Sequence, residues 1–350
     1  MLESFEENKL YLKGLDGLRA LCALCIVVGH ISQKDFCDWG GRDIYTLPVP
    51  SCCAYVFFVI SGFLAGFRTK TGMSFVNYYR KKAYRLLPLY FFYVILVIVV
   101  YSSFGWGKDV LNGRLFFYLL LMPEMPFCNS TGILPLVHLW FLGVLVLFYV
   151  LVPILAKVDS LNRKRVSLIL AVCWFILKAF SYFVFGKESF IYRFCGTACF
   201  DILFFSFFAG VSLRNLQNRG AIIAGGGIQS WWSTLPWALF LCSGLYDHYI
   251  PAPIRPEYVS LLSLLIIIGL QSSPPIILRE NKLFRRLGRI SYEIYVVHVL
   301  VIILLSKLYL LTGVELPDAV IYICCIIVVV GCAWMTERLF ASFLGLLVRN

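Results

Sequence analysis

The stretch Leu15–Ile31, with the sequence LDGLRALCALCIVVGHI, decides the fold. It is an apolar run with Arg19 near one end and His30 near the other. An eleven-residue step turns an α-helix by about three turns and 20°, so both side chains lie on one face, roughly 16 Å apart along the axis. Ionisable side chains at membrane depth normally face a protein interior or a wet cavity. We therefore expect this helix to form one wall of a polar path through a bilayer.

The composition of the whole chain is typical of a membrane protein. Apolar residues make up 60% of the 350 residues and charged residues 14%, against roughly half and a quarter in soluble domains. We predict an all-α, polytopic membrane protein that forms a single integral membrane domain over residues 1–350, with no extra soluble domain and a short re-entrant or interfacial segment at Leu115–Met122. About ten transmembrane helices are expected, at 15–33, 52–67, 86–104, 138–156, 166–185, 198–213, 229–246, 258–272, 290–306 and 318–336.

The charge distribution excludes nucleic acid as the expected partner. The net charge is +12, but most of the 31 lysines and arginines fall in alternate segments between the predicted spans. This pattern indicates a multi-pass protein with both termini in the cytoplasm and with membrane lipids as partners. The thirteen cysteines lie mostly in apolar runs and lack zinc-ligand spacing, so no metal is expected. A disulfide between Cys37 and Cys52 or Cys53 stays open.

A basic cluster precedes the third predicted span, in a segment read as a cytoplasmic loop. Arg80, Lys82 and Arg85 lie within six residues of one another, and on a helix Lys82 and Arg85 share a face. The cluster has two interpretations. It anchors the chain at the cytoplasmic surface beside anionic lipids, or it binds a phosphate-bearing cytosolic ligand.

Further polar residues lie in or beside the predicted spans. His138 directly precedes Leu139 and Trp140, while Glu293 and His298 lie in the ninth span. A membrane histidine can simply bond a neighbouring helix, but His30 aligns with Arg19 and its ordinary pKa suits proton transfer near neutral pH. Ser61 lies next to Gly62 without the spacing of a nucleophile elbow, so small residues at a helix contact are the favoured explanation.

Four motifs, taken together and in order, resemble the acyltransferase-3 family, the bacterial multi-pass membrane enzymes that O-acylate surface polysaccharides and related glycans. The first is Leu15-Asp-Gly-Leu-Arg19 followed by His30, which is similar to the family's arginine, ten residues, histidine motif. The others are Val56–Phe63 in the second span, Lys82-Ala-Tyr-Arg85 with Pro88 and Tyr90, and Gly288–His298 with Glu337-Arg338.

The resemblance implies an acyl-CoA-dependent O-acetyltransferase of the bacterial inner membrane. Acetyl-CoA would be the donor, with its phosphates at Arg80, Lys82 and Arg85. The acceptor would be a hydroxyl of an extracytoplasmic or lipid-linked glycan, such as lipopolysaccharide. His30 would be the general base, and Arg19 would hold the coenzyme or stabilise oxyanion charge. Supporting or substrate-binding roles would fall to Asp16, Ser61, His138, Trp140, Tyr292, Glu293 and His298.

The chain departs from the family pattern at two places. Lys82 stands where the family has an arginine, which keeps the charge but loses the bidentate fork. After His138-Leu-Trp140 the chain continues Phe-Leu-Gly-Val-Leu-Val, where many members carry acidic residues. This weakens the case for a catalytic carboxylate there.

Two other classes of protein compete with this interpretation. A transporter or flippase for an anionic or lipid-linked substrate would use the same polar path and basic rim. A structural scaffold fits poorly with so many ionisable groups in spans. The sequence has no P-loop, which argues against an ATP-driven pump within this chain.

Overall fold

The computed structural model describes a bundle of helices over residues 2–34, 37–50, 53–66, 74–121, 133–157, 160–186, 189–190, 203–217, 231–251, 254–272 and 281–348. Within those ranges the chain forms helices and connecting segments, and no strand. The helices of the first half are α1 (Leu2–Ile31), α2 (Cys53–Gly66), α3 (Phe75–Ser103), α4 (Gly107–Val110), α5 (Leu115–Leu119), η1 (Leu134–Leu139), α6 (Trp140–Lys157) and α7 (Ser160–Phe185). The second half contains η2 (Leu203–Phe207), α10 (Phe208–Gln217), α11 (Trp231–Leu241), α12 (Ser243–Tyr246), η3 (Asp247–Tyr249), α13 (Arg255–Ser272), α15 (Lys282–Arg289), α16 (Ser291–Thr312) and α17 (Asp318–Val348).

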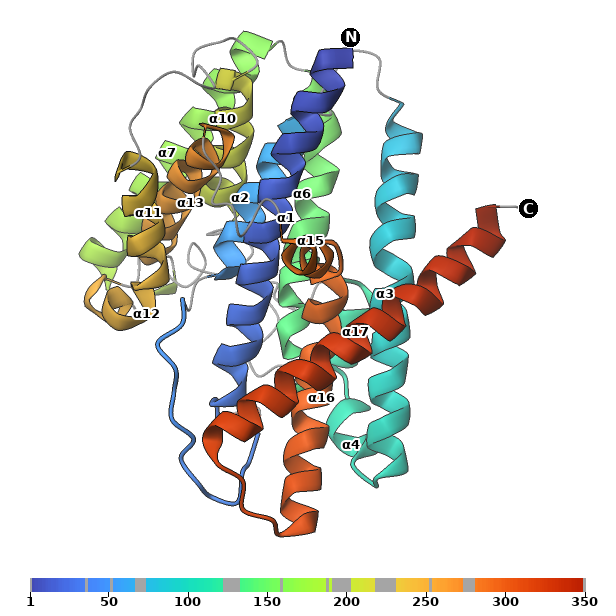
Figure 1. Cartoon of the computed structure of the whole chain (residues 1–350). Coiled ribbons are helices and arrows are strands. Elements are labelled where there is room, and N and C mark those ends of the chain that lie inside the picture. Colours follow the sequence, from blue (N-terminus) through green and yellow to red (C-terminus); the bar gives the residue numbers. More distant parts are fainter. Residues whose placement is uncertain are drawn as a thin grey trace.

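The helix α1 lies at the centre of the bundle (Figure 1). It packs against α2, α13, α15, α16 and α17. The helices α7, α10, α11 and α13 form one side of the bundle, α3 stands on the other, and α17 crosses α16 and α3 obliquely (Figure 1). The first apolar stretch of the sequence is therefore the element on which the other helices are assembled.

Six helices in the described residues are long and apolar enough to cross a membrane, which confirms a multi-pass membrane protein. They cover Gly14–Ile31, Phe75–Ser103, Leu134–Pro153, Leu168–Phe185, Ser291–Thr312 and Asp318–Phe340. The predicted count of ten is not confirmed. The described parts of the predicted spans at 52–67, 198–213 and 229–246 form shorter helices, whereas 258–272 lies within α13, an uninterrupted helix of 18 residues that is less apolar than the six. With 14 residues, α2 is about 21 Å long, less than the roughly 30 Å hydrocarbon core.

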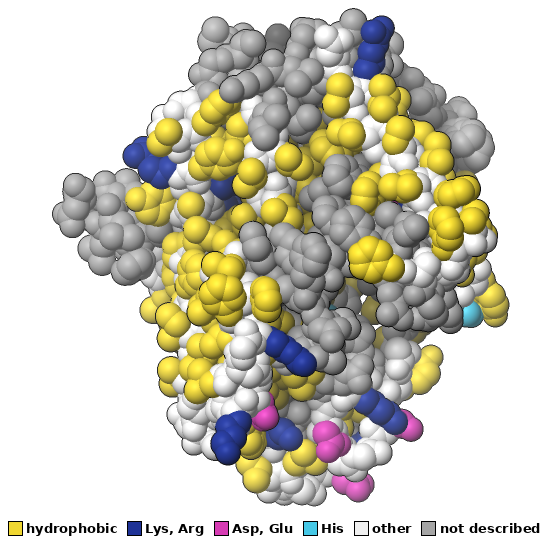
Figure 2. Space-filling model, turned by 180° about the vertical axis from the view of Figure 1, so that it is seen from behind, with side chains coloured by type: hydrophobic (Ala, Val, Ile, Leu, Met, Phe, Trp, Pro, Cys, Tyr) yellow, Lys and Arg dark blue, Asp and Glu magenta, His cyan; other side chains and the backbone are white. Residues whose placement is uncertain are grey.

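Apolar side chains cover much of the outer surface of the bundle. In Figure 2 they spread over the middle of the face, while the visible acidic side chains lie at its lower end. Only 17% of the apolar window in α7 and 28% of that in α17 is buried. These two helices therefore present the largest apolar faces of the six candidate spans to lipid.

One predicted element differs from its sequence-based description, and a second agrees with it in being too short to cross a bilayer. The basic segment that was expected to be a loop is the first part of the continuous helix α3, which begins after the N-cap Ser74. The serine hydroxyl accepts a bond from Asn77 N and so satisfies one of the free amides at the helix start. The predicted re-entrant segment contains only the five-residue helix α5, which is too short to cross a bilayer. Met122 lies outside the described residues.

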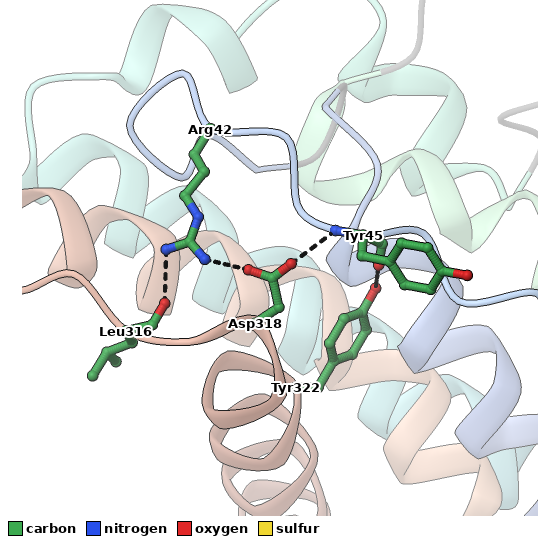
Figure 3. A network of polar contacts seen from close by, with 5 residues as sticks. All are labelled: Arg42, Tyr45, Leu316, Asp318 and Tyr322. Atoms are coloured by element: carbon green, nitrogen blue, oxygen red, sulfur yellow. Dashed lines mark hydrogen bonds and ion pairs between the residues drawn. The ribbon is translucent and has the colours of Figure 1, made fainter.

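The segment 37–50 runs along the end of the bundle where α16 joins α17, and it is tied there by polar contacts (Figure 3). Arg42 donates to Leu316 O at 2.7 Å and pairs with Asp318. Asp318 also accepts from Tyr45 N at 3.0 Å, and Tyr322 donates to Tyr45 O at 2.9 Å. The first and last membrane helices are thus joined through their connecting segments.

Cys37 and Cys53 do not form a disulfide with each other. Cys52 lies outside the described residues, so a disulfide between Cys37 and Cys52 stays a prediction. The Cys37 thiol contacts Ile31 O at 3.0 Å, and burial raises its pKa to about 11. A thiol that stays protonated at neutral pH is a poor nucleophile, so Cys37 is a structural residue.

Candidate active site

A cavity of about 420 Å³ lies between five helices of the bundle. Its walls come from α1, α2, α3, α6 and α16, of which α2 and α6 run opposite to the other three (Figure 1). The middle of the cavity is lined by Ile60, Ser61, Leu64, Leu86 and Leu145. Its two ends differ in chemistry, and we call them the basic end and the aromatic end.

The basic end is formed by Arg19, Lys82 and Arg85, together with Tyr149. The ammonium group of Lys82 lies 3.7 Å from the centre of the Tyr149 ring, which is a favourable cation–π geometry. Arg19 and Arg85 are close enough for their charges to interact. Three cations at one end of a cavity create a positive potential that favours an anionic ligand.

The Asp16 carboxylate, about one helical turn before Arg19 on α1, lies beside the guanidinium groups of Arg19 and Arg289. Asp16 Oδ1 lies 4.0 Å from Arg19 Nη1, and Asp16 Oδ2 lies 3.9 Å from Arg289 Nε. Gly288 allows this arrangement, because a Cβ at that position would overlap the Asp16 carbonyl. The backbones of α1 and α15 can therefore touch beside the basic end.

Two further predicted residues lie beside the cavity on α16. Tyr292 lines it and donates to Leu86 O at 2.7 Å, which joins α16 to α3. Glu293 acts electrostatically on Arg19 and Arg85, and its Oε2 atom is buried without a hydrogen-bond partner in the described part of the chain. Its charge partly offsets the cations of the basic end.

The aromatic end is closed by Ile26, Phe57, Phe141 and Tyr295. The ring centroids of Phe57 and Phe141 are 6.0 Å apart, and those of Phe141 and Tyr295 are 5.0 Å apart. The Tyr295 hydroxyl donates to His138 O, which fixes the ring across the cavity. The cavity therefore passes from a charged end to an apolar one.

Three histidines form the next layer beyond the aromatic end. Each lies about one helical turn from a residue of that end: His30 follows Ile26, His138 precedes Phe141, and His298 follows Tyr295. The ring centroid of His298 is 5.2 Å from that of His30 and 5.0 Å from that of His138. The structure thus brings together three residues that the sequence placed in separate spans.

The hydrogen bonds of these rings determine where their protons lie. Amide and carbonyl oxygens only accept hydrogen bonds, so His30 Nδ1 donates to Gln33 Oε1 at 2.6 Å and His298 Nδ1 donates to Tyr295 O at 2.6 Å. His138 Nε2 donates to Val296 O at 3.0 Å by the same argument. The other nitrogens of His138 and His298 are buried without partners in the described residues. In the neutral rings these nitrogens carry lone pairs that can accept a proton or a hydroxyl.

Seven predicted site residues do not line this cavity: Asp16, His30, Arg80, His138, Trp140, Glu293 and His298. Arg80 is exposed on α3 and does not line it. Trp140 packs beside Phe58 and Phe141 but does not line it either. His30 is also absent from the cavity walls, because the aromatic end separates it from the basic end. Among the described residues, no group of three His, Cys, Asp or Glu side chains is placed to hold a metal ion.

Sequence reasoning missed four residues that shape the site. Gln33 bonds His30, Tyr149 contacts Lys82, and Phe141 and Tyr295 close the cavity. The only signal for Gln33 was its position one turn after His30. Phe141 and Tyr295 stand in sequences quoted for the family resemblance, but nothing there marked them as cavity residues, and Tyr149 gave no signal because aromatic side chains are frequent in any apolar span.

Comparison with known proteins identifies the family. A family model described as an acyltransferase domain matches residues 12–338. The chain belongs to the acyltransferase-3 family. All four motifs that carry the resemblance lie within the matched residues, so that prediction is confirmed.

The curated relatives of this acyltransferase-3 chain are longer than the chain itself. The O-acetyltransferase OatA of Staphylococcus aureus strain NCTC 8325 is 23% identical over 328 residues, covering 85% of this chain and 52% of OatA. The putative peptidoglycan O-acetyltransferase YrhL of Bacillus subtilis strain 168 is 23% identical over 220 residues, covering 56% of this chain and 33% of YrhL. The chain thus spans about half the length of OatA. No solved structure matches it significantly.

Proposed function

We propose that this protein is a membrane O-acetyltransferase that moves an acetyl group from cytosolic acetyl-CoA to a glycan hydroxyl on the outer side of the membrane. The observation that carries the proposal is the order of chemical groups along one axis. Three cations, an apolar cavity and a layer of histidines follow one another within the bundle. Family membership and the names of the relatives support the same reaction class.

Each part of the axis has a role in this proposal. The basic end binds the phosphates of the coenzyme, since guanidinium and ammonium groups form strong charge-assisted bonds with phosphate. His30 Nε2 takes the proton of the acceptor hydroxyl, because Nδ1 is engaged with Gln33. The acceptor oxygen then attacks the thioester carbon, the C–S bond breaks, and the CoA thiolate leaves and takes up a proton.

Peptidoglycan is the first acceptor to test, because one relative is named as a putative peptidoglycan O-acetyltransferase. This differs from the lipopolysaccharide acceptor that the resemblance first suggested. We place the protein in the bacterial cytoplasmic membrane with both termini in the cytoplasm. The distribution of lysine and arginine between alternate segments supports this orientation.

The function is tested with purified protein in nanodiscs, radiolabelled acetyl-CoA and peptidoglycan fragments. We expect label in an alkali-labile ester on the glycan and release of free CoA. A transporter would bind or move its substrate without forming an ester. Absence of both acetyl-CoA binding and ester formation in the wild type would contradict the proposal and favour the transporter.

Removal of one cation from the basic end is expected to weaken donor binding. A hydrogen bond to a charged group contributes about 1.5–3 kcal/mol, so Lys82→Ala and Arg85→Ala should each raise the KM for acetyl-CoA by about 10- to 150-fold. Lys81→Ala is the matched control, because Lys81 is exposed beside Lys82 and does not line the cavity. If all three variants behave alike, the cluster acts only as a surface anchor.

A further inference from the structure

We propose that the aromatic end of the cavity is the acyl-binding subsite and that the Phe141 ring restricts the acyl group to a short chain. This inference rests on the proposed function, because it assumes an acyl-CoA donor. It adds the place that the acyl group occupies in the cavity and the residue that limits the length of the acyl chain.

The direction in which the donor lies follows from the position of the charges. The phosphates of an acyl-CoA require the basic end at Arg19, Lys82 and Arg85, so the thioester arm must extend away from it. On α1 the cavity extends from Arg19 to Ile26, which is about 10 Å along the axis. The acyl chain is the last part of the arm and is uncharged, so it belongs against the apolar end.

Phe141 is the side chain that closes this end. Its ring contacts Phe57, Phe58 and Tyr295, with centroid distances of 6.0, 4.4 and 5.0 Å. Only 7% of Phe141 is exposed, and the three neighbouring rings pack against it on the side away from the cavity lumen. A longer acyl chain would have to displace it, and close-packed interiors resist such displacement.

The histidine layer lies directly beyond this closed end, so the length of the acyl chain determines how close the thioester carbonyl comes to the base. The Tyr295 ring centroid is 5.7 Å from that of His298, which is in turn 5.2 Å from that of His30, so an acyl group that ends against Tyr295 lies next to the histidine layer. A short acyl group leaves its carbonyl carbon near this boundary. A longer chain would hold the carbonyl back towards the basic end, away from the base.

The test measures kcat/KM for acetyl-CoA and butyryl-CoA with the same acceptor. An added methylene in an apolar pocket changes specificity by about 10- to 200-fold. We therefore expect Phe141→Ala to raise the butyryl-to-acetyl ratio at least tenfold, and the milder Phe141→Leu to raise it less. Competition binding of the two thioesters, measured on the same variants, gives the preference even where turnover is low.

Phe148→Ala and Phe148→Leu are the matched controls. Phe148 lies on the same helix, is fully buried and stacks on Phe207 at 4.4 Å, but it does not line the cavity. The ratio should stay unchanged in these controls. A ratio within twofold of wild type in both Phe141 variants, while acetyl transfer persists, would overturn the acyl subsite and leave the proposed function intact. A wild type that transfers no acyl group from CoA would overturn both.

Discussion

Replacement of His30 by alanine is expected to lower the rate of acetyl transfer by about 10²- to 10⁴-fold, which is the usual contribution of a positioned general base. Binding of acetyl-CoA should survive, because His30 lies beyond the aromatic end and does not line the cavity. The measurement combines single-turnover ester formation with titration of acetyl-CoA into wild-type and variant protein. If His30→Ala loses acetyl transfer but still binds acetyl-CoA, His30 acts in the chemical step and not in binding of the donor.

A graded comparison strengthens this experiment. Gln33→Ala removes the acceptor that orients His30 but leaves the imidazole in place. A hydrogen bond of this kind contributes about 0.5–1.5 kcal/mol, so we expect a loss of only about 2- to 12-fold. His30→Ala protein that transfers acetyl at the wild-type rate would remove His30 from the reaction. A loss in Gln33→Ala as large as that in His30→Ala would show that both changes act through the fold.

The second large effect is expected where α2 packs against η2 and α10, because one glycine on each side of this contact faces the opposite backbone. A Cβ on Gly62 would overlap the carbonyl of Phe207, and a Cβ on Gly210 would overlap that of Val59. Alanine at either position must push the two helices apart. Overpacking of a core usually costs about 1–3 kcal/mol, and backbone atoms cannot turn aside, so we expect about 3 kcal/mol for each change.

Thermal unfolding in detergent checks this prediction against a control on α17. Gly331 has open space around its Cβ position, so Gly331→Ala should leave the melting temperature nearly unchanged. Gly62→Ala and Gly210→Ala should lower it, and their double mutant should cost less than the sum because both changes separate the same pair of helices. Equal melting temperatures for Gly62→Ala and Gly331→Ala would contradict the contact.

The sequence predicted which helices form the site better than it predicted which of those helices span the membrane. Hydropathy and charge located α1, α3, α6 and α16, because each is a long apolar run. The small-residue contact expected at Ser61-Gly62 is confirmed, since Gly62 meets the α10 region at Phe207. The lengths of helices inside the bundle, such as α2, were harder to predict from the sequence, because a short buried helix has the same apolar composition as a membrane-spanning helix.

The internal order of the site was not visible in the sequence. Helical spacing related Arg19 to His30 on α1, but it gave no information about which side chains from other helices fill the distance between them. Phe141 and Tyr295 lie there because η1 and α6 pack against α2, α3 and α16. The proximity of His298 to His30 and His138 likewise depends on tertiary packing. Each of the three residues alone looks like an ordinary polar group in a span.

The contact between Arg42 and Asp318 also has a consequence for the time at which the protein becomes complete. The two residues are 276 positions apart, and ribosomes add roughly 5–20 residues per second. Between roughly 14 and 55 s therefore pass after Arg42 is made before its partner exists. During that interval α1 is already in the membrane with its arginine and histidine, but α16 has not yet arrived to cover them. Until then Arg19 and His30 have only the nearby side chains of Asp16 and Gln33 and lack the cover of α16, so any factor that shields membrane helices during synthesis would act on α1 first.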